Sequence, residues 1–290
     1  MVPLGLLQKQ RDLTMTTQAE KGQAFRALHQ RDYAFIIPNP WDAGTARLLA
    51  HLGFEALAST SGGYASSIGV RDYAVGREAM IAHVGALASA TNLPVSADLE
   101  NGFADAPGVV AKTISLAAAA GVVGGSIEDA TGRAEDPIYE PSLAAERVRA
   151  ASESARALGF PFTLTARAEN FLHGRRDLKD TIQRLQAYQE AGADVLYAPG
   201  LTSAEEIATL VRSVDRPVNV LMGIPGSALS LAALSAMGVR RVSVGSALAR
   251  TALSAFLRAA REMRNDGTFT FAEEVPSGRE IAAMFETGQS

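Results

Sequence analysis

Short apolar runs alternate with longer amphipathic segments along most of this chain. From residue 34 onward eight such runs occur, and most lack the strict polar–apolar alternation that marks a half-exposed strand. Runs of this kind are typical of strands covered by helices on both faces, as in a parallel sheet. We therefore predict eight strands, at residues 34–37, 55–59, 94–98, 124–128, 163–166, 195–198, 217–220 and 241–244.

The segments between these runs are rich in Ala and predict helices, for example at residues 77–90, 108–120, 143–157, 178–191 and 203–213. Several end in Gly followed by a strand, as in "AGADV" and "AMGVRRV", which is typical of a helix C-cap. Eight strand–helix units in about 220 residues predict an α/β fold of the (β/α)8 TIM-barrel type. A doubly wound open sheet would also alternate strands and helices, but the count of eight favours closure.

Both ends of the chain lie outside this repeating pattern. The stretch "TTQAEKGQAFRALHQ" predicts an N-terminal helix capped by Thr16 or Thr17, with residues 1–16 as a flexible tail. At the other end, "FTFAEEVPSGREIAAMF" predicts a loop and an extra helix that has no strand of its own to cover. No long Pro/Gly/Ser linker interrupts the series, so residues 17–290 are expected to form one barrel domain with a C-terminal helical extension.

Composition narrows the compartment and the partners. The chain has 290 residues, of which 47% are hydrophobic, and no run of about 18 apolar residues or signal peptide is present, so we expect a cytoplasmic protein without membrane association. The net charge of −4 offers no basic field for a nucleic-acid backbone. The absence of cysteine excludes disulfides, thiolate metal sites and cysteine-based catalysis.

Charged side chains gather where the predicted strands end. In a (β/α)8 barrel these ends and the loops after them meet at one mouth. Four acidic residues are expected there, together with Arg167 at the end of the fifth strand. Carboxylates so close repel one another, and a divalent cation relieves the repulsion. Because only oxygen ligands are on offer, Mg²⁺, or Mn²⁺ in its place, fits better than zinc. The four acidic residues are Asp72, Asp98, Glu100 and Glu128, with Asp98 expected as the direct ligand and the others mainly acting through water.

Simpler roles for these residues stay open at this point. Asp98 and Glu100 could cap the following helix or pair with surface arginines. Arg167 and Glu169 point to the same face of a strand, so Arg167 could grip a substrate carboxylate by two parallel hydrogen bonds or form a buried ion pair that only fixes the rim. The small residues of "STSGG" bring backbone N–H groups close to an anion. The predicted substrate-binding residues are Ser59, Thr60, Ser61, Gly62, Arg167 and Asn219.

Six segments, in this order and spacing, resemble the isocitrate lyase/phosphoenolpyruvate mutase superfamily. They are "PNPWDAGTARLL", "STSGG…SIGVRD", "ADLENG", "GSIED", "TARAE" and "GADVLYAPG", within residues 35–248. The resemblance implies an α/β barrel whose eighth helix is often exchanged with a neighbouring subunit, in dimers or tetramers. It also implies Mg²⁺ that holds a 2-oxo acid while a C–C or P–C bond forms or breaks through an enolate-like intermediate.

Carried over by position, the resemblance assigns roles to the residues found above. Asp98 matches the metal-binding Asp, and Glu100 replaces the second Asp of the usual D-x-D pair. Glu128 and Asp72 match further acidic positions, and Arg167 matches the Arg that grips the substrate; we take Asp72 and Arg167 as the catalytic candidates. Residues 59–62 match the loop that binds the oxo acid.

The segment after the fourth strand, "EDATGRAEDPIYEPS", departs from the superfamily pattern. Isocitrate and methylisocitrate lyases carry a K-K/R-C-G-H loop there, whose Cys transfers a proton, and phosphoenolpyruvate mutases carry Lys and Asn. Neither set is evident, although Arg133 is a partial substitute. This favours the less specialised, oxaloacetate decarboxylase-like branch, because decarboxylation needs a donor only to reprotonate the enolate; water, Tyr197 and His173 are the candidates.

The function expected from the sequence is therefore a Mg²⁺-dependent carbon–carbon lyase or decarboxylase of a 2-oxo or 2-hydroxy dicarboxylic acid. A homodimer or homotetramer with exchanged C-terminal helices is expected from the resemblance. Two alternatives stay open: a phosphonopyruvate or phosphoenolpyruvate mutase or hydrolase, and a non-catalytic protein that binds a 2-oxo acid such as 2-oxoglutarate. Trp41 and Tyr64 are further candidates for the pocket wall.

Overall fold

Eight parallel strands form the centre of the computed structural model, which describes residues 16–287. All eight predicted strands are present, each within two residues of its predicted ends. The predicted tail, apart from residue 16, lies outside the described residues. The strands are β1 (Phe35–Ile37), β2 (Leu57–Ala58), β3 (Val95–Asp98), β4 (Gly124–Glu128), β5 (Thr163–Arg167), β6 (Val195–Tyr197), β7 (Val218–Leu221) and β8 (Arg241–Ser243).

The strands form a nearly closed barrel. Their order is β1-β8-β7-β6-β5-β4-β3-β2, and all neighbours in this order pair in parallel. Between β1 and β2, at the ends of this order, the described residues form one backbone hydrogen bond, in which Ala58 N donates to Pro38 O over 3.1 Å. The prediction of a (β/α)8 barrel is confirmed.

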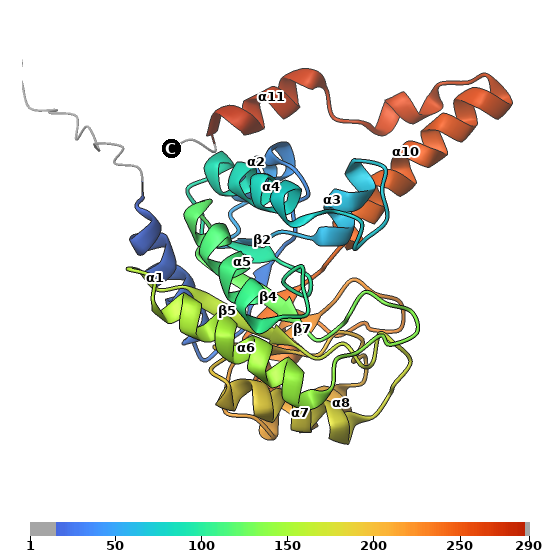
Figure 1. Ribbon diagram of the computed structural model, residues 1–290. Coiled ribbons are helices and arrows are strands. Elements are labelled where there is room, and N and C mark those ends of the chain that lie inside the picture. The colour runs from blue at the N-terminus through green and yellow to red at the C-terminus, as the bar shows by residue number, and fades with distance from the viewer. Residues whose placement is uncertain (1–15, 288–290) are drawn as a thin grey trace, which may run out of the picture.

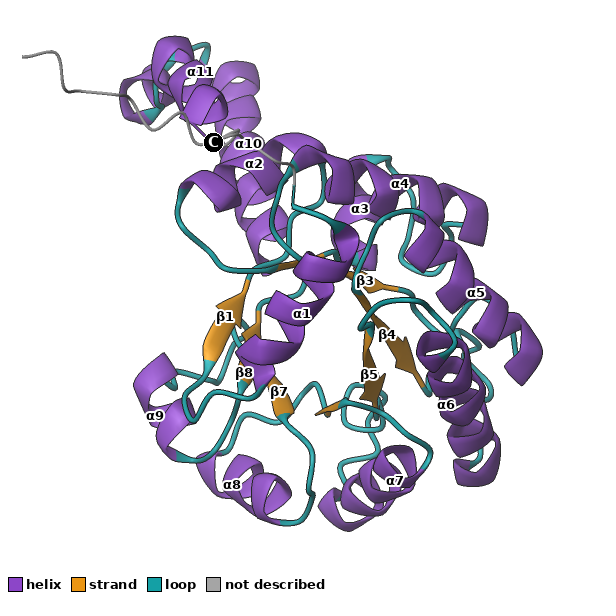
Figure 2. Ribbon diagram, turned by 90° about the vertical axis from the view of Figure 1, so that its left-hand side faces the viewer, coloured by secondary structure: helices purple, strands orange, loops and turns teal. Residues whose placement is uncertain are grey.

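Helices surround the ring of strands (Figures 1 and 2). Buried Val, Leu, Ile and Ala side chains fill the layer between the strands and the helices. The helices are α1 (Gln18–His29), α2 (Ala43–His51), α3 (Ser61–Ser67), α4 (Arg77–Ala90), α5 (Pro107–Ala119), α6 (Pro141–Arg156), α7 (Leu178–Glu190), α8 (Ala204–Arg212), α9 (Leu231–Ala236), α10 (Ala247–Asp266) and α11 (Gly278–Thr287), with a 3₁₀ turn at Thr270–Glu274.

Helix α1 closes the amino-terminal end of the barrel, and Figure 2 shows it lying across the ring of strands. Thr17 caps it in a capping box, as one of the two predicted caps. Its buried Phe25 and Leu28 pack in one cluster with side chains of β1. Gly22 allows the close approach, because a Cβ there would lie 2.3 Å from Pro161 O. The carboxyl ends of the strands are therefore the side from which a ligand enters.

The chain leaves the barrel through α10, which projects away from it (Figure 1). This 20-residue helix exposes large apolar side chains along much of its length. The predicted extra helix, α11, returns to pack against α2. No helix among residues 16–287 has the length and apolar character needed to cross a membrane. The exposed apolar residues of α10 are Leu248, Leu253, Phe256, Leu257 and Met263.

Candidate active site

A cavity of about 180 Å³ opens at the carboxyl ends of the strands. It is lined by most of the residues predicted from the sequence. Glu100 and Glu128 do not line it. The predicted residues that do are Ser59, Thr60, Ser61, Gly62, Asp72, Asp98, Arg167 and Asn219.

Asp98, the last residue of β3, is held by groups from the start of α3 and the end of β5. Its Oδ2 accepts a hydrogen bond from Ser61 N over 3.0 Å, and its Oδ1 lies 3.0 Å from Arg167 Nη1. Its own backbone N–H donates to Ser59 Oγ over 2.8 Å. The helix that follows, α5, has Ala106 at its N-cap and no side-chain cap. Asp98 therefore does not cap the helix that follows it, and it lines the cavity.

Arg167, at the end of β5, is surrounded by three carboxylates. Its Nε donates to Glu169 Oε1 over 2.8 Å, its Nη1 to Asp98, and its Nη2 lies 3.0 Å from Glu128 Oε2. The ion pair with Glu169, one of the two roles left open by the sequence, is present. These contacts use three of the five guanidinium N–H groups, so two remain for a ligand.

The negative charge around Arg167 exceeds what one guanidinium can neutralise. Glu128 and Glu169 are buried, and their pKa values are raised, mainly by burial and against the attraction of Arg167. With Asp98 as the third carboxylate, full ionisation would leave two unbalanced charges in a region with little water. A proton or a bound cation must offset them.

Glu100 is a buried acid with a carboxylate oxygen that has no hydrogen-bond donor among the described residues. That oxygen is Oε1, and only 3% of the residue is exposed. Burial raises its pKa to about 8, with Asp98 and Asp72 adding to the shift. Its backbone is left-handed, at φ 49°, and its side chain lines a neighbouring open groove rather than the cavity. A carboxylate oxygen without a donor, next to Asp98, fits a cation that binds there.

The three predicted metal ligands nevertheless do not form one ligand set. Within residues 16–287 no group of three or more acidic, His or Cys side chains is spaced to hold a metal. Glu128 is engaged by Arg167, and the left-handed backbone of Glu100 directs it to the groove. What fits a metal is Asp98 as the direct carboxylate, since Mg²⁺ often takes one or two carboxylates and keeps its waters.

Asp72 lies at the rim of the cavity, after α3. Its Oδ2 is 3.0 Å from where a Cβ of Gly62 would be, so the small residue lets the carboxylate approach the loop. The pKa of Asp72 is raised, mainly by burial and then by Asp98, while a hydrogen bond with the Ser61 side chain opposes the shift. Asp72 and Asp98 therefore line the same cavity, close enough for their charges to interact.

The loop after β2 uses several of its amides internally. Ser59 N donates to Ser96 O over 2.9 Å, Ser61 N to Asp98, and Gly63 N to Thr60 Oγ1 over 3.2 Å. These three amides already have acceptors within the protein, so they are not free to bind an anion. In this loop the backbone N–H groups of Thr60 and Gly62 remain for a ligand.

Tyr197, on β6, lines the cavity below Arg167, whose guanidinium carbon lies 5.2 Å from the ring centroid. Burial raises its pKa to about 12. His173, Trp41 and Tyr64 do not line the cavity. His173 is exposed, Trp41 lines a separate pocket together with residues of α10, and Tyr64 stacks on a buried histidine of α4. Of the proton donors and wall residues considered from the sequence, Tyr197 alone lines the cavity.

Six further polar residues line the cavity that were not predicted as site residues. They come from β3, β4 and β8, from the segment after β1 and from the N-cap of α10. An alternation of polar and apolar residues within the strands, as in "RVSV", was the available signal for the last of these strands. The six residues are Asn39, Ser96, Ser126, Arg241, Ser243 and Ser246.

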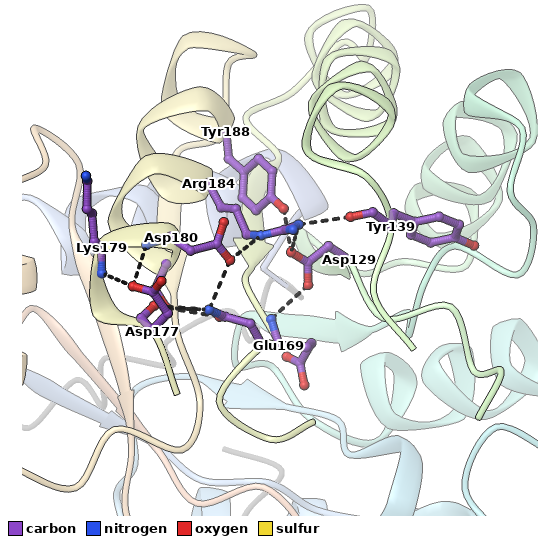
Figure 3. A network of polar contacts seen from close by, with 10 residues as sticks. Asp129, Tyr139, Glu169, Asp177, Lys179, Asp180, Arg184 and Tyr188 are labelled. Carbon is purple, nitrogen blue, oxygen red and sulfur yellow. Dashed lines mark hydrogen bonds and ion pairs between the residues drawn. The ribbon is translucent and has the colours of Figure 1, made fainter. Parts of the chain in front are cut away.

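A buried polar network behind the site fixes the ends of β4 and β5 (Figure 3). Asp129 Oδ1 accepts from Glu169 N over 2.8 Å, and its Oδ2 accepts from Tyr188 Oη over 2.6 Å and Arg184 Nη1 over 3.2 Å. Arg184 Nη1 also donates to Tyr139 O over 2.9 Å, at the end of the loop after β4. The network thus holds the residue that orients Arg167 and anchors this loop.

Arg133, in the loop after β4, is turned away from the cavity. Its Nη1 lies 2.9 Å from Asp105 Oδ1 and 3.1 Å from Oδ2, and the Asp105 carboxylate also accepts from Tyr139 Oη over 2.5 Å. Arg133 lines the neighbouring groove instead. Arg133, considered as a partial substitute for the loop residues of the mutases, does not line the cavity.

Comparison with known proteins gives a consistent family. The family model described as phosphoenolpyruvate phosphomutase matches residues 25–264. A crystal structure from Burkholderia cenocepacia J2315, whose class is given only as lyase or mutase, superposes with a TM-score of 0.91 at 66% identity. The match covers 93% of this chain and 97% of the Burkholderia chain.

Curated relatives include proteins with and without an assigned reaction. A protein of unassigned function from Mycobacterium tuberculosis (strain ATCC 25618 / H37Rv) is 35% identical over 246 residues, 84% of this chain and 90% of the relative. A 2-methylisocitrate lyase from Halalkalibacterium halodurans is 28% identical and covers 87% of this chain and 85% of its own. An oxaloacetate decarboxylase from Chromohalobacter salexigens is 28% identical, with 83% and 84% covered.

Proposed function

The chain belongs to the phosphoenolpyruvate mutase family of the isocitrate lyase superfamily, and on this premise we propose that it is a Mg²⁺-dependent lyase or decarboxylase of a small 2-oxo or 2-hydroxy dicarboxylic acid. The observation that carries the proposal is the meeting of Asp98 and Arg167 in one cavity beside the unpaired carboxylate of Glu100. The relatives named as an oxaloacetate decarboxylase and a 2-methylisocitrate lyase support the same reaction class.

The cavity supports a small substrate. Its volume of about 180 Å³ is below the roughly 300–1,000 Å³ that is typical of pockets for drug-sized ligands. Polar side chains from several strands share its lining with apolar residues such as Ile37 and Leu221, and the polar ones suit a molecule that carries carboxylate and oxo groups. A compact acid of a few carbon atoms fits this space and chemistry.

Asp98 would hold the Mg²⁺, with Glu100 and Asp72 as further negative charges near it. When bound, the ion supplies a positive charge that orients the substrate and draws electrons from its 2-oxo group. The two free N–H groups of Arg167 would bind a substrate carboxylate, and the amides of Thr60 and Gly62 would donate to the oxygen on which negative charge develops.

We propose Tyr197 as the proton donor in the last step, in which the carbon left after bond cleavage is protonated. After CO₂ or a larger fragment leaves, the remaining carbon needs one proton. Since burial raises the pKa of Tyr197 to about 12, its hydroxyl is still protonated at neutral pH. It lines the cavity, so the proton can pass from Tyr197 Oη to that carbon and be replaced from solvent.

A coupled assay tests this proposal. A panel of 2-oxo and 2-hydroxy dicarboxylates is incubated with the protein and Mg²⁺, and pyruvate formation from oxaloacetate is followed with lactate dehydrogenase and NADH. We expect turnover that EDTA abolishes and Mg²⁺ restores. The Asp98→Asn variant should lose it, while Asp215→Asn, on the exposed surface, should not. A panel without any Mg²⁺-dependent product would refute the proposal, and binding without product would indicate the non-catalytic alternative.

Phosphonate chemistry is the second candidate, because the matched family model is that of a phosphoenolpyruvate phosphomutase. The same carboxylate-and-cation platform can hold phosphonopyruvate. Incubation with phosphonopyruvate, followed by ³¹P NMR, distinguishes the two. Conversion of the phosphonate signal to phosphate or to a phosphate ester would favour a phosphonate hydrolase or mutase over a decarboxylase.

We also propose that α10 is covered by a second copy of this chain, with exchange of the C-terminal helices in a homodimer or homotetramer. In the isolated chain Phe256 is 66% exposed, and Leu253, Leu257 and Met263 are exposed beside it. Burying each such side chain is worth roughly 1.5–3 kcal/mol. Light scattering after size-exclusion chromatography should therefore give a multiple of 30.4 kDa; a mass of one chain would contradict the proposal.

A further inference from the structure

Arg241, at the start of β8, is a buried positive charge at the inner end of the cavity. It is 5% exposed, and it lines the cavity. Its Nε donates to Asn219 Oδ1 over 2.9 Å and its Nη2 to Thr165 Oγ1 over 3.0 Å, while its Nη1 lies 3.4 Å from His29 Nε2. All three partners are neutral, since burial lowers the pKa of His29 to about 3. No carboxylate among residues 16–287 lies within ion-pair distance of Arg241.

The strand pattern places Arg241 inside the barrel. Val242 packs into the apolar layer under the helices, so Arg241 and Ser243, on the other face of β8, point inward. Asn219 supports this arrangement, because its Oδ1 accepts from Arg241 and its Nδ2 donates one hydrogen to Ser243 Oγ over 2.9 Å. Asn219, predicted as a substrate-binding residue, therefore lines the cavity mainly as the support of Arg241.

An interior guanidinium without a carboxylate is costly. Interior positions of such barrels are normally filled by branched aliphatic side chains, and a buried charge usually has a charged partner. Burial, with a smaller contribution from Arg167, lowers the pKa of Arg241 to about 10, so it is still charged at neutral pH. Its three contacts leave two N–H groups without a fixed acceptor. These features indicate that the missing counterion is part of the ligand.

We infer that Arg241 binds a second carboxylate of the substrate, so that the cavity selects small acids with two negative charges over those with one. This inference rests on the proposed function and names its substrate class. One end of the acid lies at Asp98 and Arg167 and the other at Arg241, within the same 180 Å³ cavity. Because Arg241 lies in a rigid strand, the selection needs no loop movement.

Calorimetry with two matched acids tests the inference. Pyruvate and ketomalonate differ only in a methyl group against a carboxylate, and neither has a carboxylate that is lost readily. We expect the protein with Mg²⁺ to bind ketomalonate more tightly. Arg241→Gln should weaken the binding of ketomalonate by about 10–100-fold, as expected for a lost hydrogen bond to a charged group. The same variant should weaken the binding of pyruvate by less than about threefold. Arg241→Lys should retain most of the preference.

Two further variants keep the test decisive if Arg241→Gln folds poorly. Asn219→Asp has nearly the same shape and supplies a carboxylate beside Arg241 Nε, so it should remove the preference with the guanidinium still in place. Arg240→Gln is the matched control, because Arg240 does not line the cavity and donates to Gly238 O. Thermal unfolding curves confirm that each variant is folded.

The outcomes separate this inference from the proposed function. If Arg241→Gln and Asn219→Asp weaken both acids equally, or neither, Arg241 has a structural role and the inference fails even when turnover is present. If no dicarboxylate is turned over but the preference for ketomalonate depends on Arg241, the proposed reaction fails and the inference stands. If the unaltered protein binds neither acid, both fail.

Discussion

Replacing Glu100 by Gln should stabilise the protein in the absence of a divalent cation. The buried Oε1 of Glu100 has no donor, and burial together with Asp98 and Asp72 raises its pKa from 4.5 to about 8. The unfolded chain releases this proton near pH 4.5, whereas the folded chain keeps it until about pH 8. Folding therefore becomes less favourable as the pH rises between these values, and the glutamine variant avoids this cost.

The size of the effect follows from the pKa shift. Each pH unit between the two pKa values costs about 1.4 kcal/mol. From pH 4.5 to pH 7 the difference in the free energy of unfolding, variant minus parent, should thus increase by about 3 kcal/mol. Below pH 4.5 the difference should be constant, and above about pH 8 it should level off. The amide has its own burial cost, but that cost does not depend on pH, so the slope is the diagnostic quantity.

Urea unfolding at several pH values between 4.5 and 8.5, with EDTA, measures this slope. Glu146→Gln, at an exposed position of α6, is the matched control and should run parallel to the parent. With Mg²⁺ the parent should gain more stability than the Glu100→Gln variant, because the cation satisfies the carboxylate. A parent and variant that run parallel across this pH range would refute the reasoning that Glu100 is a desolvated, unpaired acid.

Three further predictions concern the cavity, the projecting helix α10 and helix α1, which closes the amino-terminal end of the barrel. Asp98→Asn should lower turnover at least a hundredfold in the coupled assay, with a melting temperature near that of the parent, since an amide oxygen can still accept from the loop; full activity would exclude a direct role. Phe256→Glu should shift the mass in light scattering toward the single chain, and an unchanged oligomer would show that α10 is not in the contact. Gly22→Ala should destabilise by about 1–3 kcal/mol in thermal unfolding, because its Cβ would clash with Pro161 O, 2.3 Å away. Gly85→Ala, in α4 with its nearest neighbour at 3.5 Å, should instead stabilise by about 0.5–1 kcal/mol, and equal effects would contradict the packing argument.

The strands and helices could be predicted because local pattern decides them. The predicted range 77–90 coincides with α4, and the predicted strand at 124–128 coincides with β4. The strand predicted at residues 55–59 is shortened to Leu57–Ala58, because Ser59 already belongs to the loop that binds Asp98. The ends of the elements depend on such tertiary contacts, which the sequence does not display.

The site could be predicted only in part, because side-chain direction depends on how the barrel closes. Asp98 and Arg167 end β3 and β5 of the same parallel sheet, so the rule for strand ends places both at the mouth. Glu100 was expected there as well, but a left-handed backbone directs it to the groove. Glu128 is engaged by Arg167 rather than turned to the cavity. Arg241 stands beside Arg240 in the sequence and resembles a surface charge; only the alternation of β8 distinguishes it.

Because a single backbone hydrogen bond joins β1 and β2, the pairing of these two strands should be the weakest in the barrel. Ala58 N, which donates to Pro38 O, should exchange its hydrogen with solvent sooner than Leu57 N, which is bound to Pro94 O on the β3 side. The loop that begins at Ser59 follows directly, so the part of the barrel that opens most readily also borders the cavity. A substrate bound to this loop should hold β1 and β2 together, and slower hydrogen exchange at the Ala58 amide would then report binding.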